Sequence, residues 1–128
     1  MKKLRIATMV TGHFTTPPPA GVIYAPMDIA VAVSEGLERR GHEVTFFAPE
    51  GSKIKVSKVK TCGLKALRQN GELSILAGLN VGGAERAKIY NLWDQFLLSS
   101  LYKEALEGKF DIIHIHPADR ALPLAYAV

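Results

Sequence analysis

Two short apolar runs separated by one amphipathic helix pattern limit the fold of this chain more than any other feature. Leu4 to Val10 and Val44 to Ala48 both read as buried strands. Between them, Pro26 fits the first helical position, Asp28 complements the helix dipole, and Gly41 fits a left-handed cap. Two strands joined by such a helix form a parallel pair. The sequence therefore predicts an α/β fold built on a parallel sheet.

The residues that follow continue the alternation of strand and helix patterns. Ile54 to Val59 alternates as a short edge strand does, whereas several glycines leave residues 63 to 83 unassigned. Ala84 to Glu107 predicts a long helix, whose apolar stripe consists of Ile89, Trp93, Phe96, Leu97, Leu101 and Ala105. Phe110 to His116 predicts another buried strand, which Pro117 ends, and Asp119 fits the cap of a following helix.

This order of elements predicts one domain over residues 1 to 128, with a Rossmann-like, doubly wound parallel sheet. The chain stops at Ala127 and Val128, within an apolar, helix-like stretch that has no cap. Because domain boundaries usually fall in exposed polar segments, we expect a domain that is truncated at its C-terminus.

Charge is the compositional feature that could indicate a partner, since the formal net charge is +4. Much of the excess lies in one stretch that has the pattern of a solvated face: Lys53, Lys55, Lys58, Lys60, Lys65 and Arg68. No zinc-finger spacing, helix-turn-helix signature or aromatic RNA-binding motif accompanies it, which argues against a nucleic-acid partner. No segment has the pattern of a signal peptide or a membrane span, so we expect a cytoplasmic protein, with peripheral membrane contact left open.

Ligands of an open parallel sheet bind beyond the carboxyl ends of its strands, so candidate site residues are sought there. Three segments meet this edge: the loop from Gly12 to Ala25, the turn from Pro49 to Lys53, and His114 to Asp119. The first loop lacks the glycine spacing of a dinucleotide-binding turn, and the P-loop motif is absent from the sequence. The candidate binding residues are Gly12, His13, Thr15, Gly21, His114 and Asp119.

The pair His114 and His116 is the most informative part of this edge. Residues two apart on a strand point to the same face, so the two imidazoles are expected on one side of the sheet. We interpret His114 as a core histidine that a backbone carbonyl satisfies, with a site role as the alternative. His116, at the exit of the strand, is the candidate catalytic residue. His13 and Asp119 could complete a zinc site, but no spacing supports one, and no metal is predicted.

Three segments in this order resemble the N-terminal domain of GT-B glycosyltransferases of family 4 (group 1). They are Pro17 to Gly21 before a helix, the turn Leu37 to Thr45 (LERRGHEVT), and the strand Phe110 to Pro117 (FDIIHIHP). The resemblance covers essentially the whole chain and is specific in these three places. The family often has two adjacent glycines where this chain has Gly21 and Val22.

The resemblance implies one half of a two-domain enzyme that transfers a sugar from a nucleotide-sugar donor with retention of configuration. The N-terminal domain binds chiefly the acceptor, an unidentified sugar, lipid or small molecule, and a C-terminal domain absent from this chain holds the donor. No cofactor is implied, because the nucleotide-sugar is a substrate, and the family typically needs no catalytic metal. Gly21 would approach the donor phosphates through backbone amides, and His116 would lie near the transferred sugar. This fragment alone is expected to be inactive.

Two alternatives remain open at this point. The first is another GT-B enzyme, such as an epimerase-like or phosphorylase-like member, because a shared half-fold does not determine function. The second is a free-standing flavodoxin-like or nucleotide-binding module that acts by binding alone.

Overall fold

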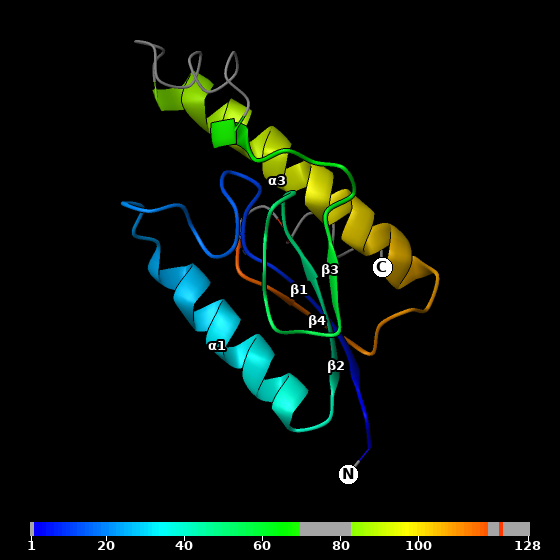
Figure 1. Ribbon diagram of the computed structural model, residues 1–128. Helices are drawn as coiled ribbons and strands as arrows, with labels where there is room; N and C mark the ends of the chain where they lie inside the picture. Colours follow the sequence, from blue (N-terminus) through cyan, green and yellow to red (C-terminus); the bar gives the residue numbers. More distant parts are fainter. Residues whose placement is uncertain (1, 70–82, 118–120, 122–128) are drawn as a thin grey trace.

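The protein forms a parallel four-stranded sheet with helices on both faces, as a computed structural model describes it for residues 2–69, 83–117 and 121 (Figure 1). The strands are β1 (Arg5–Met9), β2 (Glu43–Phe47), β3 (Lys58–Lys60) and β4 (Ile112–Ile115). The helices are α1 (Ala25–Arg39), the short 3-10 turn η1 (Leu67–Gln69) and α3 (Gly83–Leu106). The predicted α/β class and parallel sheet are confirmed.

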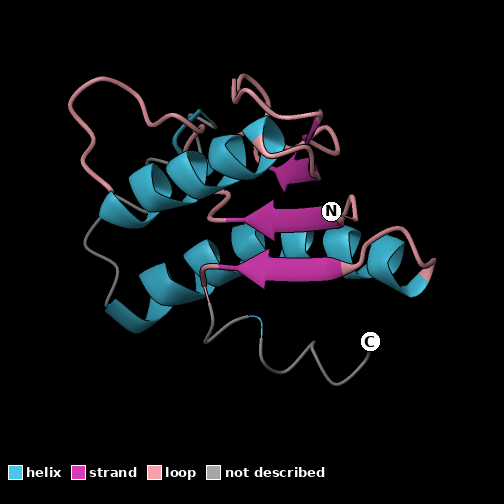
Figure 2. Cartoon of the chain, turned by 90° about the horizontal axis from the view of Figure 1, so that it is seen from below, coloured by secondary structure: helices cyan, strands magenta, loops and turns pink. Residues whose placement is uncertain are grey.

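The strands lie in the order β3-β2-β1-β4, and every neighbouring pair is parallel. Figure 2 shows the strand arrows pointing the same way. The chain moves outward from β1 to β2 and β3, and then returns past β1 to place β4 on its other side. The sheet therefore has a topological switch point between β1 and β4.

Each helix covers one face of the sheet through its own hydrophobic cluster. On the α1 face, Phe46 packs with Met27 and Ala30 of the helix. On the opposite face, Met9 and Phe47 pack with the leucines Leu97, Leu98 and Leu101 of α3. Burial of these side chains is the main stabilising term of such a layered fold, at about 25 cal/mol per Å² of apolar surface.

The third strand begins later than the alternation of residues 54 to 59 predicts. The amides of Lys55 and Ser57 donate to the Glu35 and Glu38 carboxylates of α1, and not to a neighbouring strand. Only Lys58–Lys60 pairs with β2. The carboxylates of α1 thus compete with the sheet for this segment of backbone.

The long helix is confirmed to within one residue at each end, but its buried face is rotated from the predicted stripe. Its buried residues are Asp94, Leu97, Leu98, Leu101 and Tyr102, whereas Phe96 is 46% exposed. Trp93 is only partly buried and donates its indole N–H to the carbonyl of Lys65. No helix among the described residues has the length and apolarity needed to cross a bilayer.

Candidate functional site

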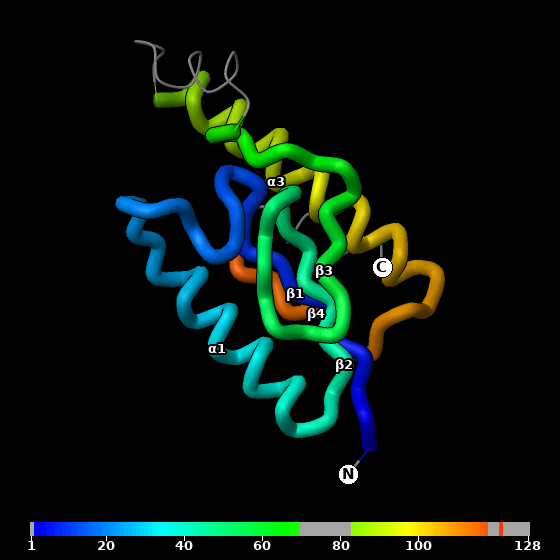
Figure 3. The backbone as a smooth tube through the Cα atoms, in the orientation of Figure 1, coloured from blue at the N-terminus to red at the C-terminus, as the bar shows by residue number. Residues whose placement is uncertain are grey.

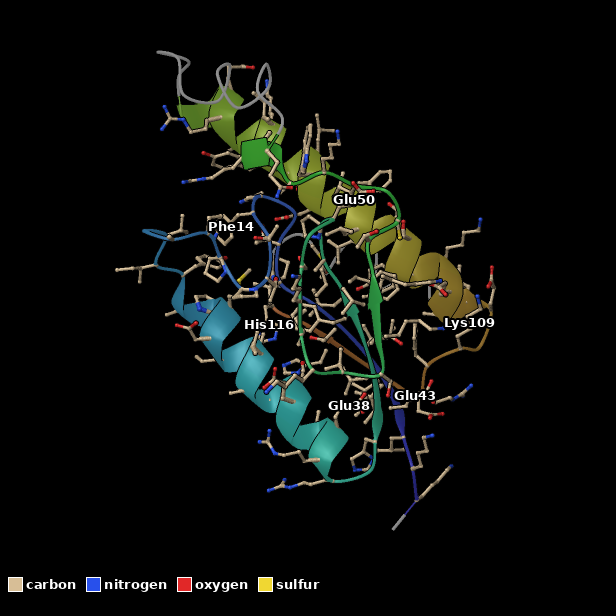
Figure 4. The ribbon with its side chains drawn as sticks, viewed as in Figure 1. Phe14, Glu38, Glu43, Glu50, Lys109 and His116 are labelled. Atoms are coloured by element: carbon tan, nitrogen blue, oxygen red, sulfur yellow. The ribbon has the colours of Figure 1, made fainter. Side chains whose placement is uncertain are left out.

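The loop after β1 and the residues that follow β4 meet at the switch point of the sheet. The His116 amide donates to the carbonyl of Met9 at 3.1 Å, which joins the ends of the two strands. Figure 4 shows Phe14 and His116 toward the carboxyl ends of the strands, whereas Glu43 lies toward their amino ends. In open α/β sheets the crevice at such a point is where ligands bind. This edge is therefore the candidate functional site.

His114 and His116 lie on the same face of the sheet, as their spacing predicts. Their ring centroids are 4.6 Å apart, and the planes are inclined by 35°. Nε2 of His116 is buried and has no hydrogen-bond partner among the described residues. A buried imidazole nitrogen without a partner is uncommon, so this atom is suited to bind a ligand hydroxyl.

The interpretation of His114 as a core histidine is wrong, because this side chain is exposed. β4 is an edge strand in the described sheet, and its neighbour on the α1 face, Ile112, is also 44% exposed. The helix α1 packs mainly over β1 and β2. The prediction of a fully buried last strand is corrected for the same reason.

Burial, and secondarily the charge of His114, lower the pKa of His116 below its ordinary value of 6.5. The folded protein therefore binds this proton less tightly than the unfolded chain. The corresponding stability is fully present above pH 6.5 and is lost as the pH falls through the lowered pKa. The neutral imidazole, which can both donate and accept a hydrogen bond, is the form that dominates near neutral pH.

We expect the free energy of unfolding to fall more steeply in the wild type than in His116→Gln as the pH decreases from about 7 to about 5. Urea titrations at a series of pH values measure this difference. The other three histidines are present in both proteins, so the comparison reports His116 together with its interaction with His114. Parallel curves for the two proteins would contradict the assigned pKa shift.

Asp94 of α3 organises the loop after β1, and the sequence analysis missed it. Its side chain is fully buried, with a relative exposure of 0%. One carboxylate oxygen accepts hydrogen bonds from the Thr11 hydroxyl at 3.0 Å and the Gly12 amide at 2.8 Å. The other oxygen lies 3.5 Å from Nε2 of His13. A buried carboxylate with these partners fixes the loop against α3.

His13 is held from two sides of its ring. Its Nε2 lies 3.1 Å from the carbonyl of Tyr90, and its ring packs on the Tyr90 ring at a centroid distance of 4.5 Å. Both Asp94 and the Tyr90 carbonyl accept hydrogen bonds, so Nε2 of His13 carries a proton. The helix α3 thus determines the orientation of a candidate binding residue in the loop after β1.

Gly12, a candidate binding residue, has a packing role in the structure. Its amide already donates to Asp94, so it does not point at a phosphate. A Cβ atom added at this position would lie 3.0 Å from the carbonyl oxygen of Trp93 and 3.3 Å from a methyl group of Leu64. Glycine is needed here because the backbone of the loop approaches the backbone of α3.

The other candidate residues occupy different surroundings. Thr15 donates its hydroxyl to the carbonyl of Pro17, which shapes the loop internally. Gly21 is exposed, has a φ of +83°, and follows Pro19 in a turn that precedes α1. Asp119 lies outside the described residues. The structure therefore brings His114 together with His116, and Asp94 fixes the loop that carries Gly12 and His13. Gly21 lies in an exposed turn that precedes α1.

Within residues 2–69, 83–117 and 121, no group of three or more histidine, cysteine, aspartate or glutamate side chains could hold a metal ion. The arrangement is suited to hydrogen-bond chemistry, in which a neutral histidine contacts a substrate hydroxyl.

No protein-family model matches the chain, and no curated protein matches it in sequence.

Proposed function

We propose that the chain is the N-terminal, acceptor-side domain of a retaining GT-B glycosyltransferase that uses a nucleotide-sugar donor. The observation that supports this most is the position of His116. It directly follows β4, the strand whose sequence resembles the family motif, and its Nε2 is buried without a partner among the described residues at the switch point. In this role His116 hydrogen-bonds a hydroxyl of the transferred sugar and stabilises the charge that develops during transfer.

The second part of the proposal concerns the division of labour between domains. Few backbone amides of the loop after β1 are left to bind a donor phosphate. The Gly12 amide already donates to Asp94, and the His13 amide donates to the hydroxyl oxygen of Thr11. Most donor contacts are therefore assigned to a second domain, as in the family that the chain resembles. The turn at Gly21 is the remaining backbone segment proposed to approach the phosphates.

Calorimetry on the 128-residue chain with UDP-glucose and GDP-mannose tests this division. We expect dissociation constants weaker than micromolar, because the chain supplies only a minority of the donor contacts. Submicromolar binding of either nucleotide-sugar would contradict the proposal and favour a binding module that acts alone. In the complete reading frame, a second αβ domain of similar size is expected to follow, whereas a stop codon after Val128 would also favour the binding module.

A further inference from the structure

Two basic segments are attached to the loop after β1 by backbone hydrogen bonds. The amide of Lys53 donates to the carbonyl of Thr16 at 2.8 Å, and the amide of Arg68 donates to the carbonyl of His13 at 3.0 Å. Figure 3 shows this blue loop beside the green segments that follow β2 and β3. The segments that carry Lys53 and Arg68 therefore lie at the carboxyl edge of the sheet, against the loop after β1.

Arg68 is oriented by an aromatic ring. Its guanidinium lies 5.9 Å from the centroid of the Phe14 ring, and Phe14 itself is only 7% exposed. The Phe14 ring in turn packs edge-on against Tyr24, with centroids 5.2 Å apart. A guanidinium over an aromatic face loses little further freedom when its planar fork binds an oxyanion. The exposed guanidinium of Arg68 is thus held in an orientation that suits binding of a carboxylate or phosphate.

The surrounding charges leave both cations available for an anion. Within the described part of the chain, the ion pairs of lysine and arginine involve Lys3, Arg5, Lys60, Lys88 and Lys109, and neither Lys53 nor Arg68. Glu50 is the acidic residue closest in sequence to Lys53, and it is exposed. Asp94, beside the same loop, already accepts hydrogen bonds from Thr11 and Gly12.

We propose that Arg68, together with Lys53, binds an anionic group on the acceptor, either a phosphate or a carboxylate. The assignment of this group to the acceptor rests on the proposed function, whereas the anion site itself does not. The two segments that carry these cations lie close together, since a Cβ atom added at Gly51 would lie 3.7 Å from Nε2 of Gln69. Two neighbouring cations suit a single small anion, and not the long row of phosphates that a nucleic acid presents. Arg68 supplies the paired N–H donors and Lys53 a second positive charge.

Two-dimensional NMR of the 128-residue chain with inorganic phosphate, glucose 6-phosphate and glucose tests this site. We expect both phosphate compounds, but not glucose, to shift the amides of His13, Thr16, Lys53 and Arg68. Arg68→Ala should weaken phosphate binding by about tenfold. The matched control is Lys58→Ala, which removes an exposed cation of β3 and should leave the affinity unchanged.

The outcomes separate this proposal from the proposed function. Equal phosphate affinity in the wild type and Arg68→Ala, or shifts that spread over all lysines, would overturn the anion site. If glucose 6-phosphate binds more tightly than inorganic phosphate, the site recognises a phosphorylated sugar and not the free anion alone. If the anion site is found while the complete protein transfers no sugar, the proposed function fails and the anion site stands.

Discussion

Replacing His116 by alanine is expected to reduce sugar transfer by about a hundredfold in the protein encoded by the complete reading frame, because donors of this kind contribute that much to transition-state stabilisation. The melting temperature should change little. Nε2 of His116 has no partner among the described residues, so its removal breaks no hydrogen bond of the described fold. Steady-state kinetics and a thermal melt of the same preparation measure both quantities.

His114→Ala is the matched control for this prediction. The exposed ring of His114 lies against His116, and its charge contributes to the lowered pKa of His116. We expect a smaller loss of rate in this variant and a shift of the acidic limb of the pH profile to higher pH. Normal turnover of His116→Ala together with a large loss of melting temperature would show that His116 is a structural residue.

Replacing Asp94 by alanine is expected to lower the free energy of unfolding by about 3 kcal/mol, since buried donors left unsatisfied cost about 1–3 kcal/mol each. The Thr11 hydroxyl and the Gly12 amide both donate to this carboxylate. Thr11 is 2% exposed, so water cannot easily replace the lost acceptor. Urea denaturation measures the change, and the loop after β1 should lose amide-exchange protection first.

Asp94→Asn separates the loss of acceptor from the loss of charge. An asparagine oxygen can still accept from Thr11 and Gly12, but its NH₂ group would face the protonated Nε2 of His13. We expect this variant to be destabilised less than Asp94→Ala. Asp28→Ala, on the exposed first turn of α1, is the comparison for a solvent-facing aspartate. If Asp94→Ala costs no more than Asp28→Ala, the carboxylate does not anchor the loop.

Local patterns were enough to predict most elements of the fold, because each is determined by neighbours in sequence. The helix α1 follows from Pro26 and from the apolar spacing after it, and α3 follows from its long periodic run. The late start of β3 could not be predicted in this way. It depends on Glu35 and Glu38, which lie about twenty residues away and accept hydrogen bonds from the segment.

The site was predicted only in part, since its tertiary contacts have no local signal. His116 is found from the alternation of a strand, because period-two spacing fixes its face. The role of Asp94 depends on donors more than eighty residues away in the sequence. One signal was present: Asp94 precedes Leu97 and Leu98 by three and four residues, which places a carboxylate on the buried face of a helix. A charged residue there indicates a polar partner.

The stereochemical outcome of sugar transfer distinguishes a retaining glycosyltransferase from the alternatives. The protein encoded by the complete reading frame is incubated with a panel of nucleotide-sugars and candidate acceptors, phosphorylated sugars among them. The anomeric proton of the product is then recorded by NMR before it can equilibrate. We expect that one donor is consumed, that a nucleoside diphosphate is released, and that the product keeps the anomeric configuration of the donor. Inversion of that configuration, or no donor consumed by a folded complete protein, would contradict it.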